Sequence, residues 1–153
     1  MREKFQVVAS TAEPVRDESY VLDEQVGFLM RIAMQRQTAI FGTRMVEGLT
    51  PTQFAALAKL YEVGPCSQNH LGRLIYLDAA TIKGVVDRLG LRGFFTALND
   101  PKDRRRRAVA LTEQGRQVTE EAMQAAVQIS TAALSPLTED ERRLLVRLLQ
   151  KIT

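Results

Sequence analysis

The sequence has 153 residues, a length that suits one compact domain with its own hydrophobic core. Its composition, 45% hydrophobic and 25% charged, is that of an ordinary globular protein, and a net charge of +3 does not by itself indicate a nucleic-acid partner. No apolar run approaches the length of a membrane helix, no stretch has the layout of a signal peptide, and one cysteine cannot form an intramolecular disulfide. We therefore expect a cytoplasmic protein that has no membrane partner.

The chain begins with a segment that has no regular pattern and continues with a helical one. Residues 1–20 mix charged and apolar side chains without a sustained period, which predicts a flexible N-terminal arm. Residues 21–47 show helical periodicity, with Gly48 at the end. One apolar stripe comprises Leu22, Val26, Leu29, Ala33 and Ile40, while Phe28, Met34, Phe41 and Met45 lie off it. A helix that is apolar on more than one side must bury more than one face, so we expect it to contact a second subunit.

A short helix is predicted to follow directly. Thr50 is a helix N-cap, Pro51 suits the first turn, Gln53 completes a capping box, and Gly64-Pro65 ends the helix. Its apolar face is predicted to comprise Phe54, Leu57, Ala58 and Tyr61.

Two further helices, at 67–75 and 78–91, are predicted to form a helix-turn-helix. Ser67 and Asp78 are their N-caps. The second of them has one apolar face, made of Ile82, Val85, Val86 and Leu89. Its opposite face has small residues and cations, which suits a recognition helix lying in a groove of DNA. Thr81 and Lys83 are the best candidates for contacts with base edges or phosphates, and Ala79 and Ala80 are close enough to touch thymine methyl groups. Arg88 lies further along the helix and is a further candidate. For Arg88, an ion pair with Asp87 is an equally good interpretation.

A basic hairpin is predicted after the recognition helix. Strand patterns at 94–98 and 105–111 flank a polar turn at 99–103, and four arginines run from 104 to 107. Residues 67–112 hold nine Lys or Arg against four Asp or Glu, a net charge of +5, so the remaining residues have −2. Because the basic charge is concentrated here, the sequence predicts a mainly α fold with a small β-hairpin wing, a winged helix-turn-helix.

The last part of the chain is predicted to form two helices. Thr112 caps a long one that is rich in small residues, Ser135-Pro136 ends it, and Thr138 with Glu141 forms a second capping box. The final apolar stripe comprises Leu144, Leu145, Leu148, Leu149 and Ile152. We therefore expect a single domain at 21–153, with a DNA-binding lobe at 50–112 and dimerisation helices at 21–47 and 113–153.

The residues of the wing also carry a family resemblance. The motif Asp100-Pro101-x-Asp103-Arg104-Arg105, followed by Val109-x-Leu111-Thr112 and Gly115, resembles the MarR family of bacterial regulators over roughly residues 21–150. The resemblance implies a homodimer that binds a pseudo-palindromic operator in double-stranded DNA. It further implies a repressor of catabolic or of stress and efflux genes, released by a small aromatic acid or a phenol.

The resemblance also assigns residues in the wing and the recognition helix. In the family, one arginine of the wing enters the minor groove and the second Asp of the motif orients it. That role falls on Arg104 or Arg105 with Asp103, and Arg106 continues the same basic run. Gly84 stands where the family commonly has a larger residue, which leaves part of the sequence preference to DNA shape.

The effector cavity of the family lies between the dimer helices and the winged helix, which points to Met34, Thr38, Tyr61 and His70. Methionines adapt to aromatic ligands, and an imidazole binds carboxylates or phenols. The methionines and phenylalanines of the first helix are more often core than pocket, and a surface or capping histidine is the plainer interpretation of His70.

Cys66 and His70 are the only residues of their kinds, one helical turn apart. No orienting acid lies near them in sequence and two ligands make a poor metal site, so we expect neither an enzyme nor a metal or other cofactor. A thiol-based redox sensor using Cys66 is an alternative, although a buried apolar thiol is the plainer interpretation. A DNA-binding protein without any effector is the other alternative.

Overall fold

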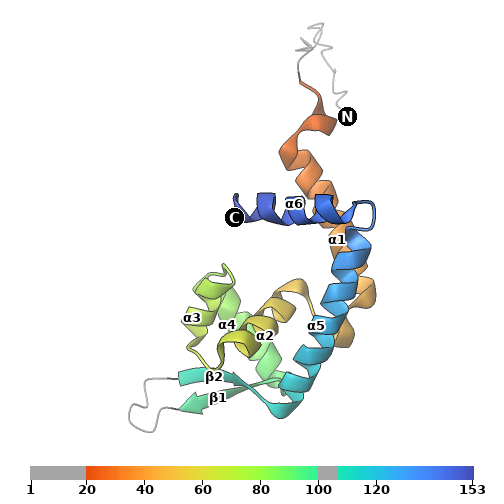
Figure 1. The fold of residues 1–153 in the computed structure, drawn as a ribbon. Coiled ribbons are helices and arrows are strands. Elements are labelled where there is room, and N and C mark those ends of the chain that lie inside the picture. Colours follow the sequence, from red (N-terminus) through yellow and green to blue (C-terminus); the bar gives the residue numbers. More distant parts are fainter. Residues whose placement is uncertain (1–19, 100–106) are drawn as a thin grey trace, which may run out of the picture. The chain divides into compact units, whose positions relative to one another are not determined.

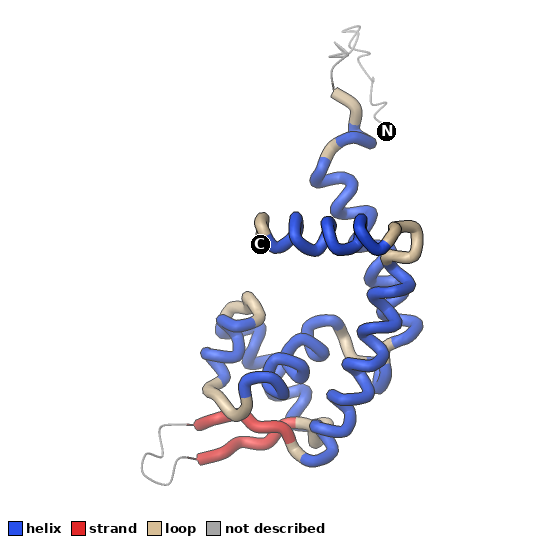
Figure 2. The backbone as a smooth tube through the Cα atoms, viewed as in Figure 1, coloured by secondary structure: helices blue, strands red, loops and turns tan. Residues whose placement is uncertain are grey.

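The computed structural model describes residues 20–99 and 107–153, and the described chain is mostly helical with one two-stranded hairpin (Figures 1 and 2). Its elements are η1 (Leu22–Glu24), α1 (Val26–Arg44), η2 (Val46–Gly48), α2 (Pro51–Val63), α3 (Gln68–Leu74), α4 (Ala79–Leu91), β1 (Phe95–Asn99), β2 (Arg107–Leu111), α5 (Glu113–Ala133) and α6 (Glu139–Gln150). The chain divides within α1 into two compact units, up to Ala33 and from Met34. The second unit contains every predicted site residue. None of the described helices is long and apolar enough to span a membrane.

Local side-chain caps determine where the helices of the second unit begin. Thr50 Oγ1 accepts a hydrogen bond from the Gln53 amide (3.2 Å), and Gln53 Oε1 accepts one from the Thr50 amide (3.0 Å), which is the predicted capping box. The other predicted caps are confirmed at Ser67, Asp78, Thr112 and Thr138. These caps satisfy amides that a helix start would otherwise leave unpaired.

Two predicted helix features differ from the structure. The first helix spans Val26–Arg44 rather than 21–47, because Gln25 and Met45 have extended backbone angles, with ψ of 127° and 137°, and separate it from the short turns η1 and η2. The buried face of α2 was predicted one position off. Its buried residues are Gln53, Ala56, Leu57 and Leu60, whereas Phe54, Ala58 and Tyr61 are half-buried.

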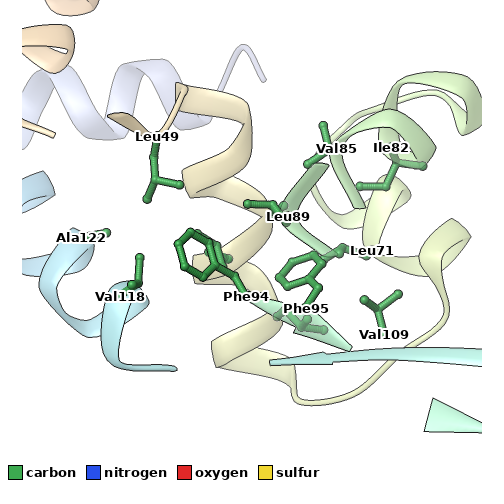
Figure 3. Close-up of a cluster of buried hydrophobic side chains, with 13 residues drawn as sticks. Leu49, Leu71, Ile82, Val85, Leu89, Phe94, Phe95, Val109, Val118 and Ala122 are labelled. Atoms are coloured by element: carbon green, nitrogen blue, oxygen red, sulfur yellow. The ribbon is translucent and has the colours of Figure 1, made fainter. Parts of the chain in front are cut away.

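One hydrophobic core joins α2, α3, α4, the hairpin and α5 (Figure 3). The predicted apolar face of α4 is confirmed, since Ile82, Val85 and Leu89 are buried in this core. Phe94, only 2% exposed, lies at its centre, and burying such a side chain stabilises a fold by about 1.5–3 kcal/mol. Because α4 is anchored along one face, its opposite face has a fixed direction in the lobe.

The hairpin is antiparallel, with Phe95 opposite Leu111 and Asn99 opposite Arg107. Its strands lie within the predicted ones, apart from Asn99, and residues 105 and 106 fall outside the described part. Cys66 adds a bridge to β2, since its amide donates to the Val109 carbonyl (3.2 Å) and the Val109 amide donates to the Cys66 carbonyl (2.8 Å). The segment before α3 is thereby fixed to the wing.

Candidate nucleic-acid interface

The five predicted contacts on α4, Ala79, Ala80, Thr81, Lys83 and Arg88, are all exposed. At 3.6 residues per turn, Ala80 and Lys83 point away from the buried Ile82, Val85 and Leu89, while Ala79, Thr81 and Arg88 lie on the two flanks of that exposed side. All five residues are therefore accessible around the part of α4 that the core does not cover. Their contacts with DNA stay a prediction.

The start of α4 is held by Asp78. One of its carboxylate oxygens accepts the Thr81 amide and the other accepts the Thr81 hydroxyl, both at 2.8 Å. The hydrogen bond from the Thr81 backbone amide, and to a smaller extent the one from the Thr81 hydroxyl, hold the pKa of Asp78 below its ordinary value. The Thr81 hydroxyl therefore already donates its proton to the carboxylate of the N-cap residue Asp78.

The two cations of this face have different partners. Lys83 Nζ lies 2.5 Å from the Asp87 carboxylate one turn further on, in an exposed ion pair. Arg88 has no ion pair or hydrogen bond of its guanidinium to any residue of the described ranges. The Arg88–Asp87 pair considered from the sequence is thus not formed. Instead, the Arg88 guanidinium lies against Gly84, where a Cβ would be 3.3 Å from Nη1.

The base of the wing is tied to α5 by Thr112. Its hydroxyl donates to the Gly93 carbonyl (2.6 Å) and accepts the Gly115 amide (2.9 Å), while its own amide donates to the Phe94 carbonyl (3.0 Å). Arg92 adds a second tie, since its guanidinium donates to the Glu47 carbonyl (2.6 Å) and lies 4.7 Å above the Phe94 ring. These bonds fix the strands from which the wing projects.

The wing contacts predicted at Asp103, Arg104, Arg105 and Arg106 lie outside the described residues. Arg107, the last of the four arginines, is exposed at the first position of β2. The predicted basic wing therefore stays a prediction, with its strand bases described.

The four predicted effector residues lie on three helices of the second unit. Met34 and Thr38 are exposed one turn apart on α1, and His70 is exposed on α3. Tyr61 on α2 is half-buried, and its hydroxyl donates to the Glu120 carboxylate (2.8 Å). A groove of about 630 Å³ between α4 and the hairpin is lined by none of the four. A common cavity for them stays a prediction.

Arg116 was not among the predicted site residues, yet its guanidinium lies 5.1 Å above the Tyr61 ring. Together with Glu120, it forms a polar cluster at the contact of α2 with α5. The only sequence signal was the spacing of Arg116 and Glu120, one helical turn apart. A distant tyrosine is not visible in such a pattern.

Cys66 has the surroundings of a structural thiol. It is half-buried, packs against the hydrophobic core and uses its backbone to pair with Val109. Burial raises the pKa of the Cys66 thiol, which lowers its thiolate fraction and hence its reactivity towards oxidants. Within the described residues, no group of three or more His, Cys, Asp or Glu side chains is placed to hold a metal ion.

A capped recognition helix with one exposed face, packed against a hairpin, defines a winged-helix DNA-binding protein. The sequence profile of the MarR family matches residues 49–106. The repressor NicR of Pseudomonas putida is 38% identical over 143 residues, which are 93% of this chain and 90% of NicR. The chain belongs to the MarR family of transcriptional regulators.

Solved structures give the same assignment. A probable transcriptional regulator from Pseudomonas aeruginosa is 49% identical, with a TM-score of 0.83 over 87% of this chain and 100% of that one. BpsR of Bordetella bronchiseptica is 39% identical, with a TM-score of 0.80 over 87% of this chain and 96% of BpsR. The DNA binding of BpsR is regulated by 6-hydroxynicotinic acid.

Proposed function

We propose that this protein is a homodimeric repressor that binds a pseudo-palindromic operator and is released from it by a small aromatic or N-heteroaromatic acid. The observation that carries the proposal is the 39% identity to BpsR, whose DNA binding 6-hydroxynicotinic acid regulates. The exposed face of α4 and the fixed base of the wing provide the surface for DNA. The effector class is taken from BpsR, and the dimer is proposed from the exposed apolar side chains of α6.

The dimer is supported by the apolar face of α6. Leu144, Leu148 and Leu149 are between 40% and 48% exposed, Ile152 just after the helix is 66% exposed, and no residue of this fully described helix is buried. A contiguous apolar stripe on a surface helix is typical of a protein contact. In a two-fold dimer the two α4 helices would contact half-sites one helical turn apart, about 34 Å.

The effector is proposed to bind beside the polar cluster of Tyr61, Arg116 and Glu120. A carboxylate there gains a cation in Arg116 and a hydroxyl donor in Tyr61, provided that it displaces Glu120 from the tyrosine. Met34, Thr38 and His70 stay candidates for contacts with the ring and its substituents. An aromatic acid fits this combination of a cation, a hydroxyl and apolar side chains better than a cationic ligand does.

The proposed release follows from the position of α2. This helix packs through Leu57 and Leu60 in the same core as α4, and it is bonded to α5 through Tyr61 and Glu120. A ligand that breaks the Tyr61–Glu120 bond changes how α2 sits against α5, and therefore where α4 points. Release requires only that the ligand binds this arrangement more tightly than the DNA-bound one.

The test begins with a duplex selected by the protein from a random DNA pool. Fluorescence anisotropy on that duplex is measured with increasing 6-hydroxynicotinic acid, with 6-hydroxynicotinamide as the uncharged control. We expect the acid alone to lower DNA affinity and to raise the melting temperature of the free protein, because ligands of the native state stabilise it by mass action. Arg116→Gln and His70→Ala should bind DNA normally but lose much of both responses.

The experiment tests operator binding, effector response and the effector residues separately. If the pool yields no preferred duplex, the protein is not a sequence-specific repressor. If a duplex is selected but a panel of aromatic acids changes neither affinity nor melting temperature, the protein is a DNA-binding protein without such an effector. Normal acid responses of both variants would remove Arg116 and His70 from the site.

A redox sensor on the same scaffold is disfavoured by the raised pKa of the Cys66 thiol. Cys66→Ser should bind the selected duplex as the parent does, and hydrogen peroxide should affect both proteins equally. Peroxide-dependent release of the parent alone would restore the redox alternative.

A further inference from the structure

We propose that Arg88, laid back over Gly84, is the side chain with which α4 reads the operator, and that it recognises guanine. The inference rests on the proposed function and names the specificity determinant of its DNA site. It replaces the sequence-based choice of Thr81 and Lys83 as base readers, and it gives Gly84 a positive role.

The two residues favoured by the sequence are engaged within α4. The Thr81 hydroxyl donates to Asp78, which it helps to hold as the N-cap. Lys83 Nζ lies 2.5 Å from the carboxylate of Asp87. A DNA contact by Lys83 would therefore have to replace its exposed ion pair with Asp87, and Thr81 would have to give up a cap hydrogen bond to donate to a base.

Arg88 differs from both. Its guanidinium has no hydrogen bond or ion pair to any described residue, so its donors are available to a ligand within this part of the chain. A Cβ built on Gly84 would lie 3.3 Å from Nη1, 3.6 Å from Nη2 and 3.8 Å from Cζ of Arg88. The guanidinium thus lies against Gly84, beside the position where a side chain at residue 84 would begin.

This position brings the guanidinium towards the N-terminal half of α4. Helical side chains lean towards the N-terminus of their helix, and Gly84 lies one turn before Arg88. The guanidinium is therefore displaced towards Ala80 and Thr81, where the exposed residues are smallest. That half of a recognition helix is the one that approaches base edges in the major groove.

Gly84 has no backbone reason to be glycine. It lies in the interior of α4 without a positive φ angle, and glycine is unfavourable there compared with alanine. A Cβ at 3.3 Å from Nη1 would be tighter than an ordinary contact, so the guanidinium would have to shift by a few tenths of an ångström. We infer that glycine at position 84 lets the Arg88 guanidinium lie against the helix backbone, and that this placement offsets the lower helix propensity of glycine.

The chemistry of the guanidinium selects guanine. Its planar fork of N–H donors matches the O6 and N7 acceptors that guanine presents together in the major groove. The Lys83 ammonium is a point charge without that geometry. One bidentate contact discriminates against a wrong base by roughly 5- to 150-fold in affinity.

The experiment compares variants on the selected duplex and on a scrambled duplex of equal length. Arg88→Lys keeps the charge and should lose roughly 5- to 150-fold per half-site on the selected duplex, with little change on the scrambled one. Gly84→Ala should lose operator affinity in the same direction while its melting temperature rises. In an Arg88→Ala background, Gly84→Ala should cause no further loss, because the two residues act as one unit.

Two controls make the result specific. Gly90 lies in the same helix, and a Cβ added there would meet nothing within 4 Å. The Gly90→Ala variant should therefore have a higher melting temperature and an unchanged operator affinity. Replacing operator guanines one at a time by 7-deazaguanine removes the N7 acceptor. The parent should lose affinity at one guanine per half-site, and Arg88→Ala should be insensitive at that position.

A parent protein that does not distinguish the two duplexes overturns the proposed function itself. If the parent distinguishes them, but Arg88→Lys and Gly84→Ala bind as it does, the reading role of Arg88 is overturned while the proposed function stands. Equal losses on both duplexes would make Arg88 a phosphate contact and would likewise overturn the inference.

Discussion

Replacing Gly115 by alanine should destabilise the fold more than any other single methyl group added to a glycine of the described chain. A Cβ at this position would lie 2.0 Å from the Phe94 carbonyl oxygen, 2.8 Å from its carbon and 3.0 Å from the Phe94 Cα. These atoms are backbone, and the Phe94 side chain is only 2% exposed. Neither side of the contact can rotate away, so α5 must move relative to the base of the wing.

That movement would strain the hydrogen bonds that join the start of α5 to the base of the wing. The Thr112 amide donates to the same Phe94 carbonyl (3.0 Å), and the Thr112 hydroxyl donates to the Gly93 carbonyl (2.6 Å). Losing a hydrogen bond costs about 1 kcal/mol, and overpacking a core costs about 1–3 kcal/mol. We expect Gly115→Ala to lower the free energy of unfolding by about 4 kcal/mol, and the melting temperature by roughly 10 °C.

Circular dichroism at 222 nm during heating, supported by urea titration, measures both quantities. Gly90→Ala is the matched control, because its Cβ meets nothing within 4 Å and its position is also helical. It should raise stability by about 0.5–1 kcal/mol. If Gly115→Ala melts within 2 °C of the parent, the close approach of α5 to Phe94 is not a rigid feature of the fold, and the reasoning is refuted.

Three further predictions concern the wing, the dimer and the caps. Replacing Arg104 and Arg105 together by alanine should weaken binding to selected and scrambled DNA alike. The slope of log affinity against log salt concentration should flatten by up to about four per dimer, and an unchanged slope would contradict wing contacts with phosphates. Deleting residues 138–153 should abolish the dimer and operator affinity, and a soluble, dimeric, binding product contradicts this. The lowered pKa of Asp78 means that its charged form favours the fold above the ordinary value of 3.8, and that this contribution is lost as pH falls through the lower folded value. Below pH 3.8 the parent should therefore lose thermal stability faster than Asp78→Asn, which keeps a cap without titrating.

The helix starts were predictable because each is determined by a few adjacent residues. Thr50, Ser67, Asp78 and Thr138 cap their helices through groups three positions further on, so the signal lies entirely within one turn. The hairpin was predictable for a related reason, since alternating patterns flank one polar turn. Local chemistry decides such features before any tertiary contact forms.

The buried face of α2 was not predictable in the same way. Phe54, Ala58 and Tyr61 are as apolar as the residues that are buried, and several stripes of this helix are suitable for a core. The stripe through Ala56, Leu57 and Leu60 is chosen because α4 and α5 approach α2 from that side. Phe54 packs partly on Phe41 instead, with ring centroids 6.2 Å apart. Only the neighbours decide between equivalent stripes.

Gly84 shows why reading a recognition helix position by position can mislead. A glycine has no side chain to read a base, so the sequence suggested a weakened readout there. In the structure the guanidinium of Arg88, one turn later, lies against Gly84. Asp78 accepts the Thr81 hydroxyl, and Asp87 pairs with Lys83. The chemistry that α4 offers to DNA is therefore a property of pairs at spacings of three and four, in which one member decides whether the other is available. Gly84 is proposed to contribute to specificity by leaving room for the Arg88 guanidinium. We therefore expect Gly84→Ala to raise helix stability and to lower the preference for operator DNA.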